Sequence, residues 1–464
     1  MSAPPRVVAR GVRRKRIVGP ILVLDPLHRA ASFHDIDLGL GGMRSTYRRP
    51  ENAWLTALAL GLLLTSSPAP LHAEDRGLDL RQAVENGLAA NKRIAAFRHR
   101  LVEQSGRVRQ AGRLPNPELL VELENVGGSG FFRGFDGAET TLSIAWAIEP
   151  GLRGRRVGIA RAHSSQTELE ARLLQLDVAA ETAQRFLSCL ESQLHLRAGD
   201  EAVALAEQTL AVVEHRVRAG GAAKPELMRA QATLATERLA REDVTHELSV
   251  AYHWLAAQWG EAAPSFSRVE GELLELPKTT DFADLEARLE RNPTLERLAS
   301  EQRIAEARLS LVRAQRWPTL KPSLGARKFE RTDDWALVAS LSLPLPIFDR
   351  KQGQIAESQA RLARTAAEIE AERVRTRAAL YEIHQELQHG VHRAEVLRDE
   401  VLPRLEASMD EIRRGYERGR YAYFELRTIQ ADLLAARRSL VEASTAAHRF
   451  LITLERLTGE GMQQ

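Results

Sequence analysis

The residues closest to metal chemistry are three histidines on one predicted helix, His384, His389 and His392. His389 and His392 share a helix face, but His384 lies about 140° from His389 at roughly 100° per residue. We therefore expect a solvated helix surface here and no metal ligands. The lone cysteine, Cys189, has no CxxC partner and adds no metal signal.

Catalytic motifs are absent from the 464 residues. The sequence has no HExxH zinc motif, no phosphate-binding glycine loop, no GxSxG nucleophile turn and no dinucleotide fingerprint. We therefore predict that the protein is not an enzyme and carries no cofactor.

The N-terminal residues predict export. Arginines precede an apolar run over 54–64, and small residues then lead to Ala73. This order is typical of a secretory signal peptide over 43–73. A membrane anchor is the alternative, but the run is about half of a membrane-spanning length. Residues 1–42 are Arg-rich and aperiodic, so we interpret them as a non-native extension upstream of a true start at Met43.

Most of the basic excess belongs to this leader. Removing residues 1–73 deletes ten of the 65 Lys and Arg and four of the 62 Asp and Glu, which leaves 55 basic and 58 acidic residues. The composition of the remaining chain does not indicate a basic surface, so we predict no nucleic-acid partner.

The rest of the chain is duplicated, and a repeat decides the architecture. Three residue pairs mark the repeat at offsets of 201, 201 and 199: Asn91 with Asn292, Pro117 with Pro318, and Gly220 with Gly419. Each unit reads helix, strand, turn, strand, very long helix, glycine turn, helix, and the first helix of the first unit is predicted over 79–113. We place the first repeat at 74–259, the second at 282–464, and a linker or small equatorial segment at 260–281.

Two strands are predicted in each repeat, near 117–125 and 139–149 and near 319–329 and 334–345. Apolar side chains alternate along them with small or polar ones. This alternation is typical of a barrel wall with lipid outside and water inside, and also of a half-buried soluble sheet, which the pattern alone favours. In lipid, however, a sheet with open edges is not stable, and four strands cannot enclose a lumen. A membrane sheet therefore requires several chains.

Very long helices are predicted over 153–217 and 350–417. From Leu169 to Leu194, leucines and alanines recur at alternating steps of four and three, which is a heptad seam. A helix over 153–217 would be roughly 100 Å long at about 1.5 Å per residue. It is either a soluble coiled coil or a wall that crosses a wide compartment, and the export signal favours the wall.

The sequence over 79–458 resembles the TolC family of outer-membrane export channels, mainly through the duplicated order. Two motifs resemble its heavy-metal, CzcC-like branch: Asn116-Pro-Glu-Leu119 with Glu122, Glu124 and Asn125, and the stretch from Gly415 to Leu426. The resemblance implies a mainly α fold with a small β part. It also implies a homotrimer whose twelve-stranded barrel lies in outer-membrane lipid and continues as a periplasmic helical barrel. The implied partners are a periplasmic adaptor and an inner-membrane RND pump.

In this family, the glycine turns between the long and short helices form the periplasmic tip where the adaptor docks. The resemblance places Gly220, Gly221, Gly419 and Arg420 at that tip. Gly220 and Gly419 also stand where a helix must stop, and an ordinary helix cap is the simpler reading.

Family members narrow the tip with inward carboxylates, one of them six residues beyond the second turn glycine. This spacing selects Glu425, and Glu226 is its first-repeat counterpart. Three residues after Glu425, where a second acid is common, this chain has Thr428, which puts a double ring in doubt. These three residues are the candidates for a pore constriction, with an ordinary surface role as the alternative for either glutamate.

We therefore expect the outer-membrane channel of a tripartite RND-type efflux system that exports heavy-metal cations. The same channel could serve drug efflux or type I protein secretion, because the inner-membrane pump chooses the cargo. A non-transporting coiled-coil scaffold is the alternative from another class.

Overall fold

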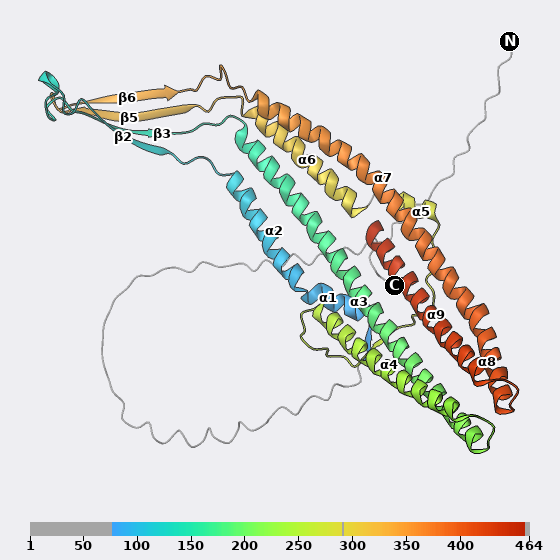
Figure 1. The fold of residues 1–464 in the computed structure, drawn as a ribbon. Helices are drawn as coiled ribbons and strands as arrows, with labels where there is room; N and C mark the ends of the chain where they lie inside the picture. The colour runs from blue at the N-terminus through green and yellow to red at the C-terminus, as the bar shows by residue number, and fades with distance from the viewer. Residues whose placement is uncertain (1–76, 290–291, 460–464) are drawn as a thin grey trace, which may run out of the picture. The chain divides into compact units, whose positions relative to one another are not determined.

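A computed structural model describes residues 77–289 and 292–459. The expected extension and signal peptide, 1–42 and 43–73, lie outside the described residues. The described chain is mainly helical with a small β part, as predicted (Figure 1). None of its helices combines the length and apolarity that a membrane span requires.

Four antiparallel strands form one sheet in the order β2-β3-β5-β6. Their bounds are β2 Glu118–Glu124, β3 Glu139–Ala145, β5 Lys321–Phe329 and β6 Asp334–Ser342. Each repeat supplies one hairpin, and the hairpins join where β3 pairs with β5, for example at Leu142 and Ala326. β3 ends earlier than predicted because its pairing beyond Ala145 continues only as isolated bonds, such as Ile148 N to Leu320 O.

Long helices make up most of the rest. They are α2 (Lys92–Ala111), α3 (Leu152–Arg218), α4 (Lys224–Ala257), α6 (Pro293–Ala314), α7 (Gln352–Val396), α8 (Leu402–Glu417) and α9 (Tyr423–Thr458). The 67 residues of α3 span about 100 Å at about 1.5 Å each. α3 packs against α2, α4, α6 and α9, while α7 packs against α6 and α9. β3 leads into the start of α3 and a glycine turn follows its end, so the sheet and this turn lie at opposite ends of one helix.

Asn91 and Asn292 have the same structural role in the two repeats. Asn91 caps the start of α2 and donates a hydrogen bond to the carbonyl that ends α4 (2.7 Å). Asn292 caps the start of α6 and donates to a carbonyl in the last turn of α9 (2.6 Å). Because the cap requires extended backbone at Asn91, the single helix predicted over 79–113 is in fact two, α1 (Leu80–Ala90) and α2.

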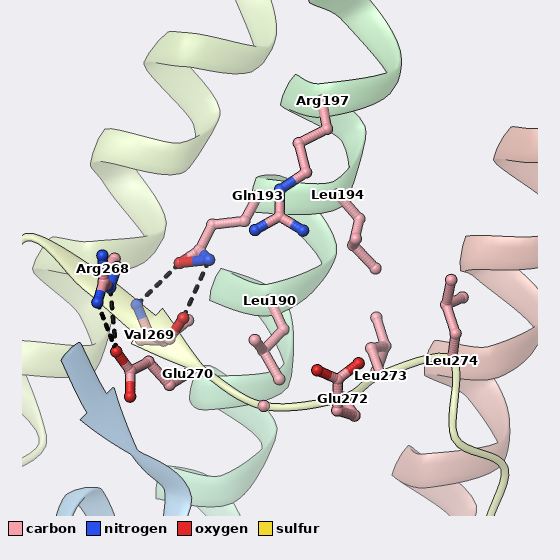
Figure 2. A pocket seen from close by; sticks show the side chains of 11 residues that line it. Leu190, Gln193, Leu194, Arg197, Arg268, Val269, Glu270, Glu272, Leu273 and Leu274 are labelled. Carbon is pink, nitrogen blue, oxygen red and sulfur yellow. Dashed lines mark hydrogen bonds and ion pairs between the residues drawn. The ribbon is translucent and has the colours of Figure 1, made fainter.

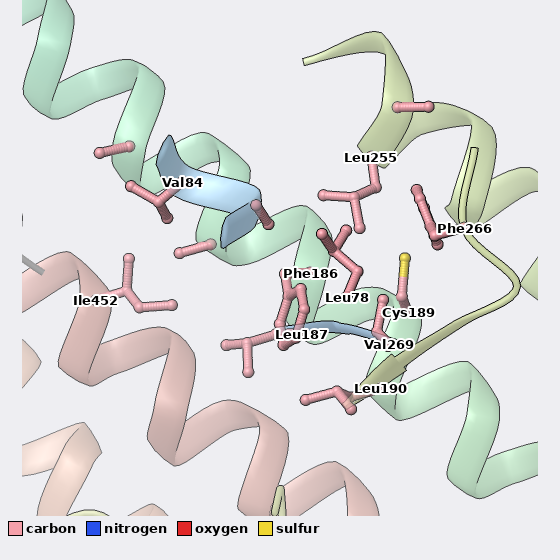
Figure 3. Packing of buried hydrophobic residues seen from close by; sticks show 14 of the residues in the cluster. Leu78, Val84, Phe186, Leu187, Cys189, Leu190, Leu255, Phe266, Val269 and Ile452 are labelled. Carbon is pink, nitrogen blue, oxygen red and sulfur yellow. The ribbon is translucent and has the colours of Figure 1, made fainter. Parts of the chain in front are cut away.

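The largest buried cluster joins α1, α3, α4, α9 and the segment after α4 (Figure 3). Phe186 on α3, Leu255 on α4 and Phe266 beyond α4 meet in it. Fully burying side chains of this size stabilises a fold by about 1.5–3 kcal/mol each. Cys189 lies in the same cluster, and burial raises the pKa of its thiol to about 12. The thiol therefore stays protonated and unreactive.

Residues 260–281 form a strap across α3. Within it, β4 (Arg268–Glu270) pairs in parallel with β1 (Gly77–Asp79). Gln193 on α3 holds β4 in place: its Oε1 accepts from Val269 N (2.8 Å) and its Nε2 donates to Val269 O (3.1 Å) (Figure 2). The segment expected to be a linker or equatorial piece is thus fastened to the longest helix.

The helix predicted over 350–417 is interrupted by a π-helical turn, Leu397–Val401, between α7 and α8. Pro403 has no N–H and cannot donate to the carbonyl four residues earlier. The Leu402 N–H bonds instead to Leu397 O, five residues back, which is the π-helical pattern.

Candidate functional site

One face of the sheet is apolar and exposed. The strand register places on this face Leu119, Val121, Leu123, Leu142, Ile144, Leu324 and Leu337. Their exposed fractions run from 42% for Ile144 to 77% for Leu337. A continuous apolar face of this kind requires an apolar environment or a partner.

The opposite face is polar and is held by ion pairs. The Arg327 guanidinium reaches carboxylates of Glu124 (2.7 Å) and Glu139 (2.8 Å), so it links β5 to both strands of the first hairpin. Lys321 reaches Glu118 in the same way (3.2 Å). A sheet with an apolar face and a charged, hydrogen-bonded face can separate lipid from water.

The second candidate region is formed by the two glycine turns. Gly220 has φ +75°, and the N–H groups of Gly220 and Gly221 bond back to Val217 O (3.1 Å) and Arg216 O (2.8 Å). These are the two bonds of a Schellman cap, which favours glycine because the left-handed residue has no Cβ.

The second turn repeats this geometry. Gly419 has φ +76°, its N–H bonds to Tyr416 O (3.0 Å), and Arg420 N bonds to Gly415 O (2.8 Å). All four residues that the sequence placed at a tip therefore lie in the two turns, and each pair of residues forms a helix cap.

Three side chains join the two turns, and we refer to Arg216, Tyr416 and Glu226 as the turn clamp. Arg216 donates to Tyr416 O (2.9 Å) and to Gly221 O (2.7 Å), and its guanidinium carbon lies 4.3 Å from the centre of the Tyr416 ring. The Tyr416 hydroxyl donates to Glu226 Oε2 (3.1 Å). The clamp thus ties the C-terminal end of α3 and the N-terminal end of α4 to the C-terminal end of α8.

The Tyr416 phenol is almost completely buried. Burial, and next the bond to the Glu226 carboxylate, raise its pKa to about 12. The Tyr416 hydroxyl therefore stays protonated near neutral pH and remains a hydrogen-bond donor.

Sequence reasoning selected Glu226 but missed Arg216 and Tyr416. The available signal was their position, four residues before Gly220 and three residues before Gly419. Nothing local indicated that residues 200 positions apart would bond.

Glu425 and Thr428 both lie on the first turns of α9 and are exposed. Glu425 Oε2 accepts from Ala422 N (2.6 Å), so the carboxylate caps the helix that follows the second turn. Thr428 donates only to Phe424 O of its own helix (3.0 Å). Glu226 and Glu425 thus have different hydrogen-bond partners, and the structure assigns Glu425 a structural bond in addition to its charge.

The expected solvated surface for the three histidines is wrong for one of them. His389 and His392 are exposed, but His384 is buried. Its Nε2 hydrogen-bonds Thr280 O of the strap (3.0 Å), and its ring packs on Phe282. The strap covers this side of α7, which the helix periodicity could not indicate. Within 77–289 and 292–459, no group of three or more His, Cys, Asp or Glu side chains is placed to hold a metal.

Comparisons with known proteins agree with this geometry. The sequence model of the family described as outer membrane efflux protein matches residues 83–261 and 285–460. The chain is 25% identical over 383 residues to the cobalt-zinc-cadmium resistance protein CzcC of Cupriavidus metallidurans, covering 82% of this chain and 90% of that protein. It is 23% identical over 341 residues to the nickel-cobalt-cadmium resistance protein NccC of Alcaligenes xylosoxydans xylosoxydans, covering 72% and 75%. Among solved structures, CusC matches with a TM-score of 0.69 at 17% identity, covering 82% of this chain and 92% of CusC.

Proposed function

The chain belongs to the outer membrane efflux protein family, and on this premise we propose that it is the trimeric outer-membrane channel of a tripartite system exporting divalent heavy-metal cations. The similarity to CzcC over most of both chains carries the cargo assignment. The chain itself would act as a passive conduit, since energy would come from an inner-membrane pump of the RND type.

Free strand edges support the trimer. Among the described strands, β2 and β6 each have a neighbour on one side only. In lipid, each unsatisfied backbone group on such an edge costs several kcal/mol. Three chains would pair β2 of one with β6 of the next and close a ring of twelve strands, with the exposed apolar face toward lipid and the Arg327 face toward water.

Cargo is tested by deleting the gene in its host. We expect several-fold lower tolerance of Co²⁺, Zn²⁺ or Cd²⁺, restored by a plasmid copy, because the pump would have no exit through the outer membrane. Cell-associated metal measured by mass spectrometry should rise in parallel. Unchanged metal tolerance with lost tolerance of lipophilic drugs would instead favour the drug-efflux alternative.

The two glycine turns would form the periplasmic tip where an adaptor docks, at Gly220, Gly221, Gly419 and Arg420. Both turns end rigid helices in fixed caps, so they present a defined surface. The pore constriction would lie beside them, with Glu425 as the first candidate and Glu226 and Thr428 as the others.

Glu425→Gln separates the charge of this residue from its capping bond. Glutamine keeps an oxygen that can accept from Ala422 N, so the start of α9 should stay folded. Three lost charges at a water-filled mouth should lower the permeability ratio of cations over anions on the order of threefold, since such charges set potentials of about one kT. Reversal potentials in planar bilayers under a salt gradient measure this ratio. An unchanged ratio in a well-folded variant would remove Glu425 from the constriction.

A further inference from the structure

Basic side chains gather where the sheet meets the helices. At this level α2 and α6 end, and α3 and α7 begin (Figure 1). The four segments 109–113, 149–156, 313–316 and 349–353 together contain nine Lys or Arg and two acidic residues, a net charge of +7 per chain. We refer to these nine basic side chains as the basic belt.

Little of this positive charge is neutralised within the described chain. The two acidic residues, Glu149 and Asp349, each pair with one member of the belt. Arg153 donates to a backbone carbonyl at the end of α2 (2.7 Å), which fixes the helix ends and leaves the charge in place. Arg113 and Arg316 are exposed, and neither pairs with a carboxylate of the described residues. The belt can therefore still attract an anion.

Large aromatic side chains are exposed beside the basic belt. Trp317 directly follows Arg316 and is 72% exposed, and Phe348, two residues before Arg350, is 89% exposed. Trp146 is also exposed, and it extends the apolar face of the sheet, since its N–H still bonds to β5 (3.0 Å). We refer to these three aromatic residues as the aromatic belt.

The sequence of surfaces matches one leaflet of a membrane. From the sheet toward the helices, the surface passes from apolar to aromatic and then to basic side chains. A leaflet passes in the same direction from acyl chains, through the interface that tryptophan prefers, to the phosphates that attract lysine and arginine. The far end of the sheet differs, because its turns, 126–138 and 330–334, contain two Arg and four acidic residues. Of the two ends of the sheet, only the end next to the helices is basic.

We infer that the basic belt binds anionic phospholipid headgroups in the periplasmic leaflet of the outer membrane, with Trp317 and Phe348 in the interface beside them. The inference rests on the proposed outer-membrane channel, because it requires the apolar face of the sheet to lie in lipid. Charge complementarity selects phosphatidylglycerol over phosphatidylethanolamine, whose headgroup has no net charge. Continuity of the aromatic belt with the apolar face favours a lipid over an acidic protein. Binding should weaken as salt rises.

The test counts bound lipids by native mass spectrometry of the detergent-solubilised channel, mixed with phosphatidylglycerol or phosphatidylethanolamine at equal concentration. We expect about threefold more bound phosphatidylglycerol. The R113E/R316E channel should bind the two lipids equally, because the net charge of the belt falls from +7 to +3 per chain. Phosphatidylglycerol should also raise the melting temperature of the unmodified channel by several degrees more than that of R113E/R316E.

A double reversal away from the belt, R172E/R229E, is the matched control and should behave like the unmodified channel. R113K/R316K keeps both charges and should also retain the preference. R113Q/R316Q, a milder change in case the double reversal does not fold, should bind phosphatidylglycerol at an intermediate level.

Equal binding of both lipids to the unmodified channel, or an unchanged preference in R113E/R316E, would overturn the inference. A changed anion permeability of R113E/R316E with unchanged lipid binding would also overturn it, because the arginines would then act on mobile anions in the pore. Conductance in planar bilayers separates the two claims: a conducting channel without lipid preference retains the proposed function, whereas a chain that forms no channel removes it.

Discussion

Gly325→Val should prevent the sheet from forming. Gly325 lies in the middle of β5, opposite Ser143 of β3 and Val338 of β6. A Cβ at this position would press on the Leu142 carbonyl oxygen and would lie 2.7 Å from Ser143 Cα. Both are backbone atoms of the pairing strand, so no side-chain rotation relieves the contact.

Overpacking of this kind costs about 1–3 kcal/mol even where side chains can move, and it would occur once in every chain of a trimer. We expect little Gly325→Val protein in the outer membrane and no heat-resistant trimer on unboiled gels. Gly325→Ala should show a smaller loss, since its methyl group alone meets the same backbone. Gly353→Ala is the control, because a Cβ there has open space. Normal trimer yields for Gly325→Val would mean that β3 and β5 do not pair as described.

Local sequence features determined most of the architecture. The effects of proline, of glycine and of alternating apolar and polar side chains extend over only a few residues. The strands could therefore be predicted near Pro117 and Pro318, and the ends of the long helices near Gly220 and Gly419. The long helices followed from periodicity in the same way. What remained inaccessible depends on contacts between segments far apart in sequence.

Two errors illustrate this limit. The break at Asn91 exists because the side chain bonds the carbonyl of Gln258, 167 positions away, while capping the next helix. His384 is buried because the strap crosses α7 at Thr280, although its spacing from His389 and His392 predicted an exposed surface. In both cases the residue alone was ambiguous, and a distant backbone carbonyl decided its role.

The candidate site also combines predictable residues with unpredictable contacts. Spacing from the turn glycines selected Glu226 and Glu425 as candidates. Their hydrogen-bond donors, the Tyr416 hydroxyl for Glu226 and the Ala422 N–H for Glu425, were not predicted. Glu226 therefore has a clear structural function as an acceptor for Tyr416. This bond adds to the buried cluster in which α3 and α4 pack against α8 and α9 near the turns, with Val213, Ala230, Met409 and Leu426 among its members.

Arg216→Ala should produce a leaky channel. The substitution removes two hydrogen bonds, to Tyr416 O and Gly221 O, and the stacking of the guanidinium on the Tyr416 ring. Hydrogen bonds to charged groups contribute about 1.5–3 kcal/mol when buried, and partial exposure of Arg216 reduces this to about 1–2 kcal/mol per chain. With the clamp weakened in each chain of the proposed trimer, α8 and α9 should separate from α3 and α4 more often, and resting conductance in planar bilayers should rise on the order of tenfold.

Arg218→Ala provides the control for this prediction, because Arg218 lies two residues after Arg216 and its guanidinium donates to a carbonyl of its own helix, Glu214 O (3.4 Å). Its conductance should match that of the unmodified channel, and both variants should form trimers of normal stability. Tyr416→Phe removes only the bond to Glu226 and should fall between the two. Because the Tyr416 hydroxyl has a pKa of about 12, its ionisation should not change the leak of Arg216→Ala between pH 6 and pH 8. Resting conductance unaltered in Arg216→Ala would show that the clamp stabilises the turns without holding the tip closed.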